Sequence, residues 1–294
     1  MIVLTGPTGN VGAEVARLFA GSVDPGAFRV AAHHPDRGRE MLGRRVQVVA
    51  FDYDDAATWP AAFAGIRSLF LIFPLPTPRA VRTRMIPVID AAVAAGCRHI
   101  VYLSVPGADA NKVVPHYRVE RHIEASGADW TFLRSAFFMQ NLHRTISSHG
   151  IDIAEHDEVF IPAGRGSTSF VDAADIAEVA RLALLHPEGH RRRGYVLTGP
   201  ARLRMDEVAT ALSDVLGRSI RYNRPSMARF WYRLARRGVP LDSIAFMTIV
   251  YTLTRTGRNE PMTDDLERLI GRPPRRLREW AEHAAWRWEQ RVWT

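Results

Sequence analysis

The feature that most constrains the fold is a short apolar segment that runs directly into a glycine-rich turn. Residues 1–4 are all apolar, as in a buried parallel strand, and the turn reads Thr5-Gly6-Pro7-Thr8-Gly9-Asn10-Val11-Gly12. Apolar residues at helical spacing follow, so a helix is expected to begin near Asn10: Val11, Val15, Leu18 and Phe19. A strand, a glycine turn and a helix in this order are typical of dinucleotide binding. The sequence therefore predicts an α/β fold, a Rossmann-type doubly wound parallel sheet.

Each glycine of the turn has an expected task. Gly6 allows the tight turn, Gly9 the close approach of a pyrophosphate, and Gly12 close packing of helix on strand. The free N–H groups at the helix start would face the anion. The alternative is an ordinary connection between strand and helix. The cofactor contacts expected here are Gly6, Thr8, Gly9, Asn10, Val11 and Gly12.

The end of the second expected strand, Phe28–Ala32, indicates which dinucleotide is bound. An acidic residue at this point accepts hydrogen bonds from the ribose of NAD, whereas a basic residue favours the extra phosphate of NADP. Here the strand ends in His33 and His34, with Arg37 just beyond and no acid at the tip. NADP(H) is therefore favoured, and Asp36 is expected to cap the following helix.

Two further strands are expected to contribute to the same edge of the sheet. Residues 46–53 form a strand that ends in Asp52 and Tyr53, although Asp52 is also suited to cap the helix expected over 56–63. Residues 68–73 form the next strand, which stops at Pro74-Leu75-Pro76. We expect the backbone of Phe73 and Pro74 to pass under the nicotinamide ribose, since ligands of such sheets bind at the carboxyl ends of the strands.

Several motifs resemble the short-chain dehydrogenases and reductases. The Gly-x-x-Gly-x-x-Gly spacing of the turn is similar to their extended and atypical forms. The stretches 116–127 and 129–134 and the segment Phe137-Phe138-Met139-Gln140-Asn141-Leu142 resemble the NmrA-like branch of the atypical forms. Further matching segments are 170–177, 195–200, 205–209 and 216–218, so the resemblance covers nearly the whole chain.

The resemblance also shows what this chain lacks. Short-chain reductases carry a serine after the fifth strand, here Ser104, and then a Tyr-x-x-x-Lys pair that protonates the substrate. Lys112 is the sole lysine, so the pair is absent; Tyr117 and Arg121 reproduce the spacing only.

Aligned on Glu120, the family's lysine position falls on His116 and its tyrosine position on Lys112. The resemblance implies that His116 lies near the nicotinamide ribose, as a hydrogen-bonding group or proton donor, and that Asp52 and Tyr53 lie beside the adenine. The alternative for His116 is a polar residue at a helix start. Ser104, His116 and Tyr117 are the catalytic candidates.

The last third of the chain differs in character. An aromatic helix over 227–237 and an apolar one over 241–254 are separated by Gly238-Val239-Pro240. Such a pair suits a smaller, mostly helical substrate or lid region that excludes water from a hydride transfer, or else plain core or a dimer surface. We divide the chain into a cofactor domain, 1–150, and an interleaved, not independent, substrate region, 151–294. The expected substrate contacts are Phe137, Phe138, Asn141, Phe230, Trp231 and Phe246.

Composition narrows the remaining classes. Cys97 is the one cysteine, so no internal disulfide forms, and a cytoplasmic protein, monomer or homodimer, is expected. The apolar run 244–253 is too short to span a bilayer. Most of the net charge of +8 lies in residues 201–294, but acids are interspersed, which favours solvated faces over nucleic-acid binding. By residue type Asp172 and Asp175 suggest a metal pair, but Asp175 is expected to cap a helix and no supporting cluster accompanies them, so no metal site is expected.

Three functions follow, in order of preference. The first is an NADPH-dependent reductase acting on a carbonyl of a large, apolar, polycyclic aromatic substrate, similar to ketoreductases that tailor aromatic polyketides in antibiotic biosynthesis and lack the Tyr/Lys pair. The second is a non-catalytic NADP(H)-binding redox sensor of NmrA type. The third is a quinone reductase without flavin.

Overall fold

The computed structural model describes residues 1–74, 76–143, 148–258 and 261–289. The chain forms two compact units, each built from two segments. The first unit comprises Met1–Ser135 and Ala173–Leu197, and the second Ala136–Asp172 and Thr198–Thr294. The boundary predicted at residue 150 differs from this division, because the chain leaves the first unit after Ser135 and later returns to it. That the second unit does not fold independently stays a prediction.

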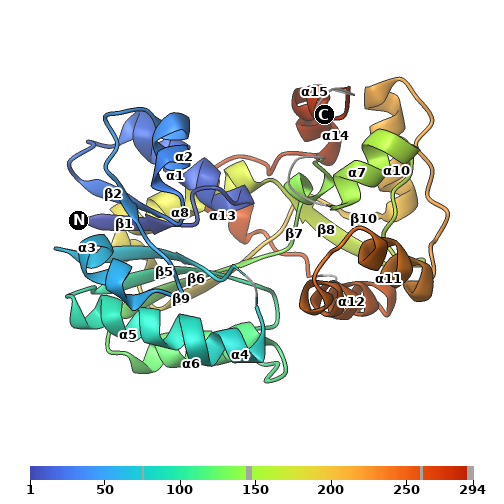
Figure 1. Cartoon of the computed structure of the whole chain (residues 1–294). Coiled ribbons are helices and arrows are strands. Elements are labelled where there is room, and N and C mark those ends of the chain that lie inside the picture. The colour runs from blue at the N-terminus through green and yellow to red at the C-terminus, as the bar shows by residue number, and fades with distance from the viewer. Residues whose placement is uncertain (75, 144–147, 259–260, 290–294) are drawn as a thin grey trace. The chain divides into compact units, whose positions relative to one another are not determined.

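A seven-stranded parallel sheet forms the centre of the first unit (Figure 1). Its strands, in spatial order, are β3 (Val48–Ala50), β2 (Phe28–Ala32), β1 (Ile2–Thr5), β4 (Ser68–Ile72), β5 (His99–Ser104), β6 (Asp129–Ser135) and β9 (Arg193–Leu197). The strand order reverses between β1 and β4, and ligands of such sheets bind at this switch point. The predicted Rossmann-type doubly wound sheet is confirmed.

Helices cover both faces of this sheet. The helix α1 (Asn10–Ser22) packs beside α8 (Ala173–Leu185) on one face, while α5 (Ile86–Ala94) and α6 (Pro115–Ala125) cover the other (Figure 1). Because both faces are covered, every residue of β2 and β5 is buried. The remaining helices of the unit are α2 (Pro35–Leu42), η1 (Ala56–Thr58), α3 (Trp59–Phe63), α4 (Pro78–Ala80), η2 (Val81–Met85) and α9 (Pro187–His190).

One strand of the first unit is shorter than predicted. The strand predicted over 46–53 is reduced to β3, since its partner β2 ends at Ala32 and the chain turns back through a bridge between Asp52 and Asp55. In the helical segment 78–94, the middle element η2 is a π-helical turn that stands ahead of Pro87. Proline has no N–H to donate to the preceding turn, which accounts for the irregularity.

All three predicted capping carboxylates are wrong. Asp36 lies within the first turn of α2, where it pairs with Arg39, and His34 precedes the helix instead. Asp55 rather than Asp52 caps η1, accepting a hydrogen bond from the Ala57 N–H. Asp175 lies inside α8, which begins two residues earlier. In each case the helix starts one or more residues away from the place that the sequence pattern indicated.

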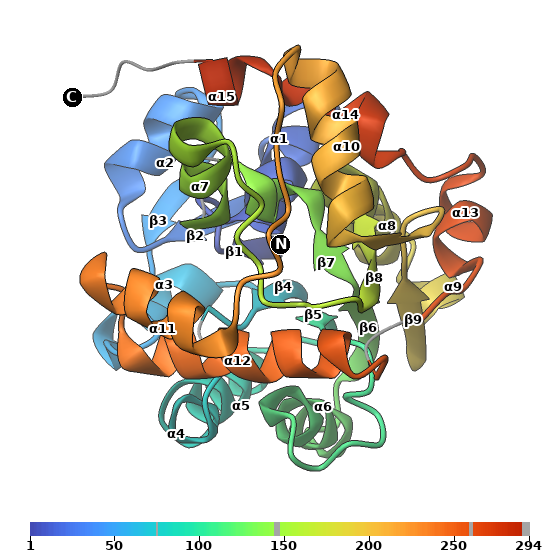
Figure 2. The same cartoon turned by 90° about the vertical axis from the view of Figure 1, so that its right-hand side faces the viewer.

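The second unit combines a small sheet with helices (Figure 2). Its strands, in spatial order, are β10 (Arg202–Arg204), β8 (Ser167–Val171) and β7 (Phe137–Phe138). Its helices are η3 (Met139–Leu142), α7 (Ser148–His156), α10 (Met205–Leu216), α11 (Met227–Arg236), α12 (Leu241–Arg255), α13 (Asp265–Ile270), α14 (Leu277–Ala284) and α15 (Trp286–Glu289). The predicted helical pair over 227–254 is confirmed as α11 and α12.

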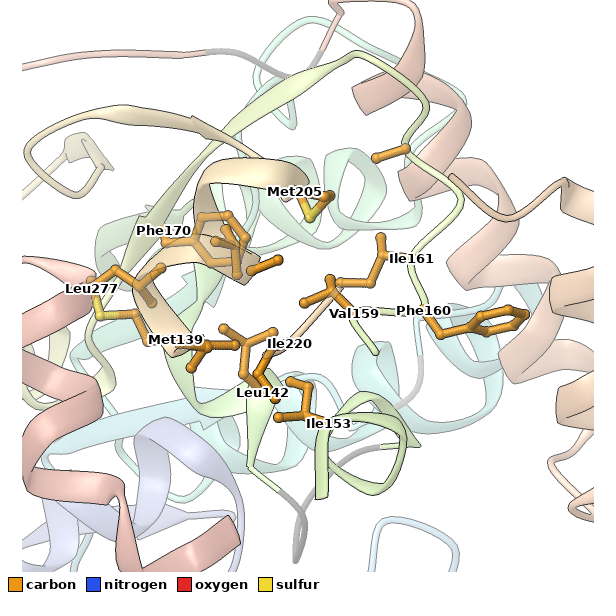
Figure 3. Close-up of a cluster of buried hydrophobic side chains, with 14 of the residues drawn as sticks. Met139, Leu142, Ile153, Val159, Phe160, Ile161, Phe170, Met205, Ile220 and Leu277 are labelled. Carbon is orange, nitrogen blue, oxygen red and sulfur yellow. The ribbon is translucent and has the colours of Figure 1, made fainter. Parts of the chain in front are cut away.

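One hydrophobic core holds the second unit together. Met139, Ile153 and Phe170 meet residues from α10 and α14, which lie side by side, so segments far apart in sequence share one core (Figures 2 and 3). The described tryptophans of the C-terminal segment lie on two short helices, α14 and α15. Trp280 and Trp288 are buried, Trp286 is exposed, and Trp293 lies outside the described residues. No helix in the described ranges is long and apolar enough to cross a membrane.

Candidate cofactor and active site

The glycine turn has the backbone geometry that a dinucleotide requires. Gly6 has a φ of +66°, which side chains rarely adopt, and its carbonyl accepts a hydrogen bond from the Gly9 N–H at 3.1 Å. A Cβ atom on Gly12 would lie 2.0 Å from the Gly6 carbonyl oxygen, so only glycine fits there. Gly9 precedes α1, no side chain caps this helix, and its first turn holds no acid. The positive end of α1 is therefore available to an anion.

The ends of β1 and β4 are joined through side-chain hydroxyls. The Thr5 hydroxyl donates to the Phe70 carbonyl (2.9 Å) and accepts from the Ile72 N–H (3.1 Å). The Tyr53 hydroxyl donates to the Ile72 carbonyl at 2.6 Å, and burial raises its pKa well above the ordinary value. The phenol of Tyr53, expected beside adenine, is thus directed into the sheet edge, and only its half-buried ring is available for stacking.

The end of β2 carries two histidines and, contrary to the sequence reading, an acid. The rings of His33 and His34 are exposed and meet at 3.1 Å, Nδ1 to Nε2. Asp52 comes from the end of the next strand and lies 3.1 Å from Nε2 of His33. Arg37 is exposed on α2. Sequence reasoning missed the approach of Asp52 because the turn after β3 that brings it to the tip has no local signal.

The other cofactor candidates lie in the glycine turn, at the start of α1 and directly after β4. Thr8 is exposed in the turn, while Asn10 and Val11 begin α1. Phe73 is buried directly after β4 and Pro74 is exposed, whereas Leu75 lies outside the described residues.

Ser104, the first catalytic candidate, is part of a buried ion-pair network. Its hydroxyl donates to Oε1 of Glu120 at 2.6 Å, and the guanidinium of Arg134 binds both oxygens of the same carboxylate at 3.0 and 2.8 Å. Glu120 is fully buried. The hydrogen bonds of this network compensate the buried negative charge of Glu120, which would otherwise be costly inside the protein. They also direct the hydroxyl proton of Ser104 toward the carboxylate as a hydrogen bond.

His116, the second candidate, is held by a tyrosine that the sequence reading passed over. Nδ1 of His116 lies 2.7 Å from the hydroxyl of Tyr102 in β5, and Phe73 meets the imidazole edge-on with ring centres 5.3 Å apart. The histidine is 5% exposed, and burial lowers its pKa to about 3. His116 is therefore neutral near pH 7 and has no acidic proton of the imidazolium kind to give.

Tyr117, the third candidate, is not brought into this group. Adjacent residues of a helix point about 100° apart, so Tyr117 leaves α6 on a different side from His116. The ring is half-buried beneath the guanidinium of Arg121, 5.5 Å from its centre.

The predicted substrate residues all belong to the second unit, with unequal exposure. Phe137, Phe138, Asn141 and Phe246 are half-buried. Trp231 is 38% exposed, and its indole N–H donates to the Thr248 hydroxyl at 2.7 Å. Phe230 is fully buried against Tyr251 and Phe160, which corrects its assignment: this side chain is core in the structure. Helical periodicity alone did not distinguish the inner from the outer face of α11.

Buried polar groups of the second unit were missed from the sequence. His149 on α7 hydrogen-bonds the Tyr251 hydroxyl on α12, and Asp152 is bound by Arg233 (2.7 Å) and Arg237 (2.7 and 2.9 Å). These partners stand 81 to 102 residues apart, and no local pattern pairs them. Asp172 accepts from Gln140 and pairs with Arg275. Within the described part of the chain, no three His, Cys, Asp or Glu residues are grouped as a metal site.

The chain is similar over nearly its whole length to curated reductases. It is 35% identical to an NAD(P)H azoreductase of Xenophilus azovorans, over 97% of this chain and 98% of that protein. It is 36% identical to a (4-alkanoyl-5-oxo-2,5-dihydrofuran-3-yl)methyl phosphate reductase of Streptomyces griseus, with the same coverage. Among solved structures, Citrobacter sp. triphenylmethane reductase complexed with NADP(H) superposes with a TM-score of 0.83 at 26% identity, covering 97% of this chain and 100% of that one.

The family is settled by a match over most of the chain. The model of the NmrA-like family matches residues 1–282. This match includes the glycine turn, α6 with His116 and Glu120, and the strands of both sheets. The resemblance inferred from separate motifs is confirmed: the chain belongs to the NmrA-like family.

Proposed function

We propose that this protein is an NADPH-dependent reductase that delivers hydride to a large, apolar, aromatic acceptor without a Tyr/Lys pair. The observation that carries the proposal is the fit of the glycine turn to a dinucleotide. The turn combines a left-handed Gly6, a Gly12 that admits no Cβ, and a helix α1 with no side-chain cap. The reductases to which the chain is similar support an oxidoreductase in preference to other users of the same fold.

Residues of the first unit account for each part of the dinucleotide. We assign the pyrophosphate to the first amides of α1, and the additional phosphate of NADPH to His33, His34 and Arg37. We assign contacts with the adenine to Asp52 and Tyr53. Contacts with the nicotinamide ribose are assigned to Phe73, Pro74 and His116. When bound, NADPH supplies a hydride from its nicotinamide ring. The protein's own contribution at that end is orientation and exclusion of water.

Reduction of a carbonyl needs one proton besides the hydride, and neither buried candidate of the first unit is a strong acid. Ser104 donates to Glu120 and His116 is neutral, with a pKa near 3 because of its burial. We therefore propose that the proton comes from water or from a hydroxyl of the substrate, with His116 acting as a hydrogen-bond donor. Tyr117 is the least favoured donor.

An aromatic acceptor is supported by two reductases to which the chain is similar, an azoreductase and a triphenylmethane reductase. The half-buried side chains Phe137, Phe138 and Phe246, with Trp231 and Asn141, are the proposed contacts in the second unit. Aromatic rings bury large areas and stack on planar substrates. A polycyclic ketone of polyketide type and a quinone are the two acceptors we would test first.

One observation favours a second candidate, a non-catalytic NADP(H)-binding redox sensor. A protein whose serine proton is held by Glu120 and whose histidine is neutral has its polar groups arranged for binding rather than for proton transfer. Turnover separates the two candidates, because a sensor binds the dinucleotide but does not consume it.

The test measures binding and turnover with the same preparation. Calorimetry gives the affinities for NADPH, NADP, NADH and NAD, and absorbance follows NADPH oxidation with a polycyclic ketone, a quinone and an azo dye. Tighter binding of NADPH than NADH together with turnover of one acceptor is the expected result. Preference for NADP without turnover would support the sensor, and absence of binding to all four would refute the cofactor assignment.

A further inference from the structure

The hydrogen bond between Tyr102 and His116 bears on which nitrogen of the histidine ring carries the proton. Tyr102 lies in the middle of the sheet on β5 and is fully buried, and its hydroxyl has no hydrogen-bond partner other than Nδ1 of His116 among the residues that the structure describes. The remaining ring nitrogen, Nε2, makes no hydrogen bond to any described residue. His116 stands beside Phe73, at the carboxyl end of β4.

The direction of the hydrogen bond follows from counting protons. A tyrosine hydroxyl carries one proton, and burial together with the charge of Glu120 and the neighbouring Tyr53 raises the pKa of Tyr102 well above its usual value. The phenol therefore stays protonated. A buried donor is normally satisfied, and Nδ1 is the acceptor within reach, so Nδ1 cannot itself carry a proton. The neutral imidazole must then hold its proton on Nε2.

We propose that Tyr102 is a positioning residue that fixes His116 as a neutral Nε2–H donor, and that this N–H donates a hydrogen bond to an oxygen or nitrogen at the nicotinamide end of the site. That atom belongs either to a ribose hydroxyl or to the reducible group of the acceptor. The inference rests on the proposed function for the identity of the ligand, but the tautomer itself does not depend on it. Ser104 does not fill the same role, because its proton is engaged by Glu120.

The tautomer is tested directly by nuclear magnetic resonance on the full chain with 15N-labelled histidine. Long-range proton–nitrogen spectra distinguish the Nε2–H form, the Nδ1–H form and the imidazolium. With His116 assigned by comparison with His116→Gln, the expected result is the Nε2–H form from pH 5 to pH 8. An Nδ1–H form or an imidazolium at pH 7 would overturn the proposal. The titratable and charged groups around the Tyr102–His116 pair are Tyr53 and Glu120, and Arg134 binds Glu120.

Substitution tests the role of Tyr102. In Tyr102→Phe the buried Nδ1 loses its donor, so the Nδ1–H form should become populated and the donor at Nε2 should be lost from part of the molecules. An unchanged Nε2–H signal in a folded Tyr102→Phe protein would show that Tyr102 does not fix the ring. Should this variant fail to fold, the spectrum of the unaltered protein still decides the tautomer.

The identity of the accepting atom follows from NADPH affinity and kcat/KM measured on His116→Leu, with His116→Gln as the control that keeps a neutral N–H. A ribose acceptor predicts that Leu weakens NADPH binding by about three- to tenfold. A substrate acceptor predicts unchanged NADPH affinity and a similar loss in kcat/KM. Gln should restore most of either loss, and equal loss in both variants would refute donation from Nε2. Failure of the unaltered protein to bind NADPH would instead refute the proposed function.

Discussion

In the first unit, the buried polar side chains of the candidate site lie at or shortly after the carboxyl ends of parallel strands, whereas in the second unit the buried His149 and Asp152 bind partners from other helices. Thr5 and Ser104 end strands of one sheet, and His116 and Glu120 come from the helix that follows β5. In the second unit, Asp152 and His149 on α7 meet partners on or next to α11 and α12. The polar groups of the first unit therefore follow from topology, while those of the second depend on how particular helices pack. The predictions below perturb matching features of the two units.

Acidification should have the largest effect, and it acts on both units. Burial lowers the pKa of His116 and His143 to about 3, and of His99 and His149 to about 4. Below about pH 6.5 the unfolded chain binds a proton at each histidine and the folded chain does not, so stability falls as the pH falls. Each site contributes up to about 1.4 kcal/mol per pH unit, and we expect cooperative unfolding, followed by circular dichroism, between pH 6 and pH 4.

A single substitution separates the units in that experiment. Neither ring nitrogen of His143 has a hydrogen bond to a residue that the structure describes, and the ring stacks on Trp280, with ring centres 4.9 Å apart. His143→Phe should keep the stacking and shift the acid transition to lower pH, with little effect at pH 8. A transition that does not move would mean that the second unit is not the limiting one at acid pH.

Removal of the Asp152 carboxylate in the second unit should have the next largest effect. Asp152→Ala takes away a buried carboxylate that both Arg233 and Arg237 bind, while Glu158 stays 3.1 Å from Arg233. Loss of one member of a buried ion pair typically costs about 3–5 kcal/mol, and we expect the lower part of this range. Denaturant unfolding measures the loss. NADPH affinity should stay unchanged, since the cofactor residues belong to the first unit. Asp36→Ala, which removes an exposed carboxylate, is the control and should change stability little.

A substitution in the glycine turn of the first unit should instead weaken cofactor binding. Gly12→Ala places a Cβ against the Gly6 carbonyl, so we expect a loss of roughly 1–3 kcal/mol and at least a tenfold loss of NADPH affinity. Gly21 lies in the same helix with open space around it, and Gly21→Ala should leave binding intact and add up to about 1 kcal/mol. Equal NADPH affinity in the two variants would contradict a pyrophosphate site at this turn.

The smallest effect is expected at the end of β2. His33→Ala with His34→Ala removes two groups assigned to the extra phosphate but leaves Arg37, so NADPH affinity should fall about three- to tenfold while NADH affinity does not. Unchanged NADPH affinity in the double variant would assign the phosphate to Arg37 alone.

Much of the first unit was predictable because its signals are local. The apolar strand, the glycine turn and the spacing of Val11, Val15 and Phe19 specify β1 and α1. Strands β2, β4 and β5 repeat the same rule of a short buried run before a turn. What failed depended on contacts distant in sequence. Asp52 reaches His33 through the turn after β3, and Tyr102 was read only as a strand residue although its hydroxyl meets a helix fourteen residues later. Phe230 is of a residue type that suits a substrate contact, and only its packing shows that it belongs to the hydrophobic core.

The return of the chain to the first unit sets an order for its assembly during synthesis. Helix α8, which packs beside α1, and strand β9, which completes the sheet next to β6, are made only after Ala136–Asp172 of the second unit. A nascent chain that has emerged as far as Ser135 carries six strands of the sheet, but one side of β6 is unpaired and the side of α1 that packs on α8 is uncovered. A chaperone that shields apolar surface could bind these uncovered parts of the first unit until residue 197 has left the ribosome.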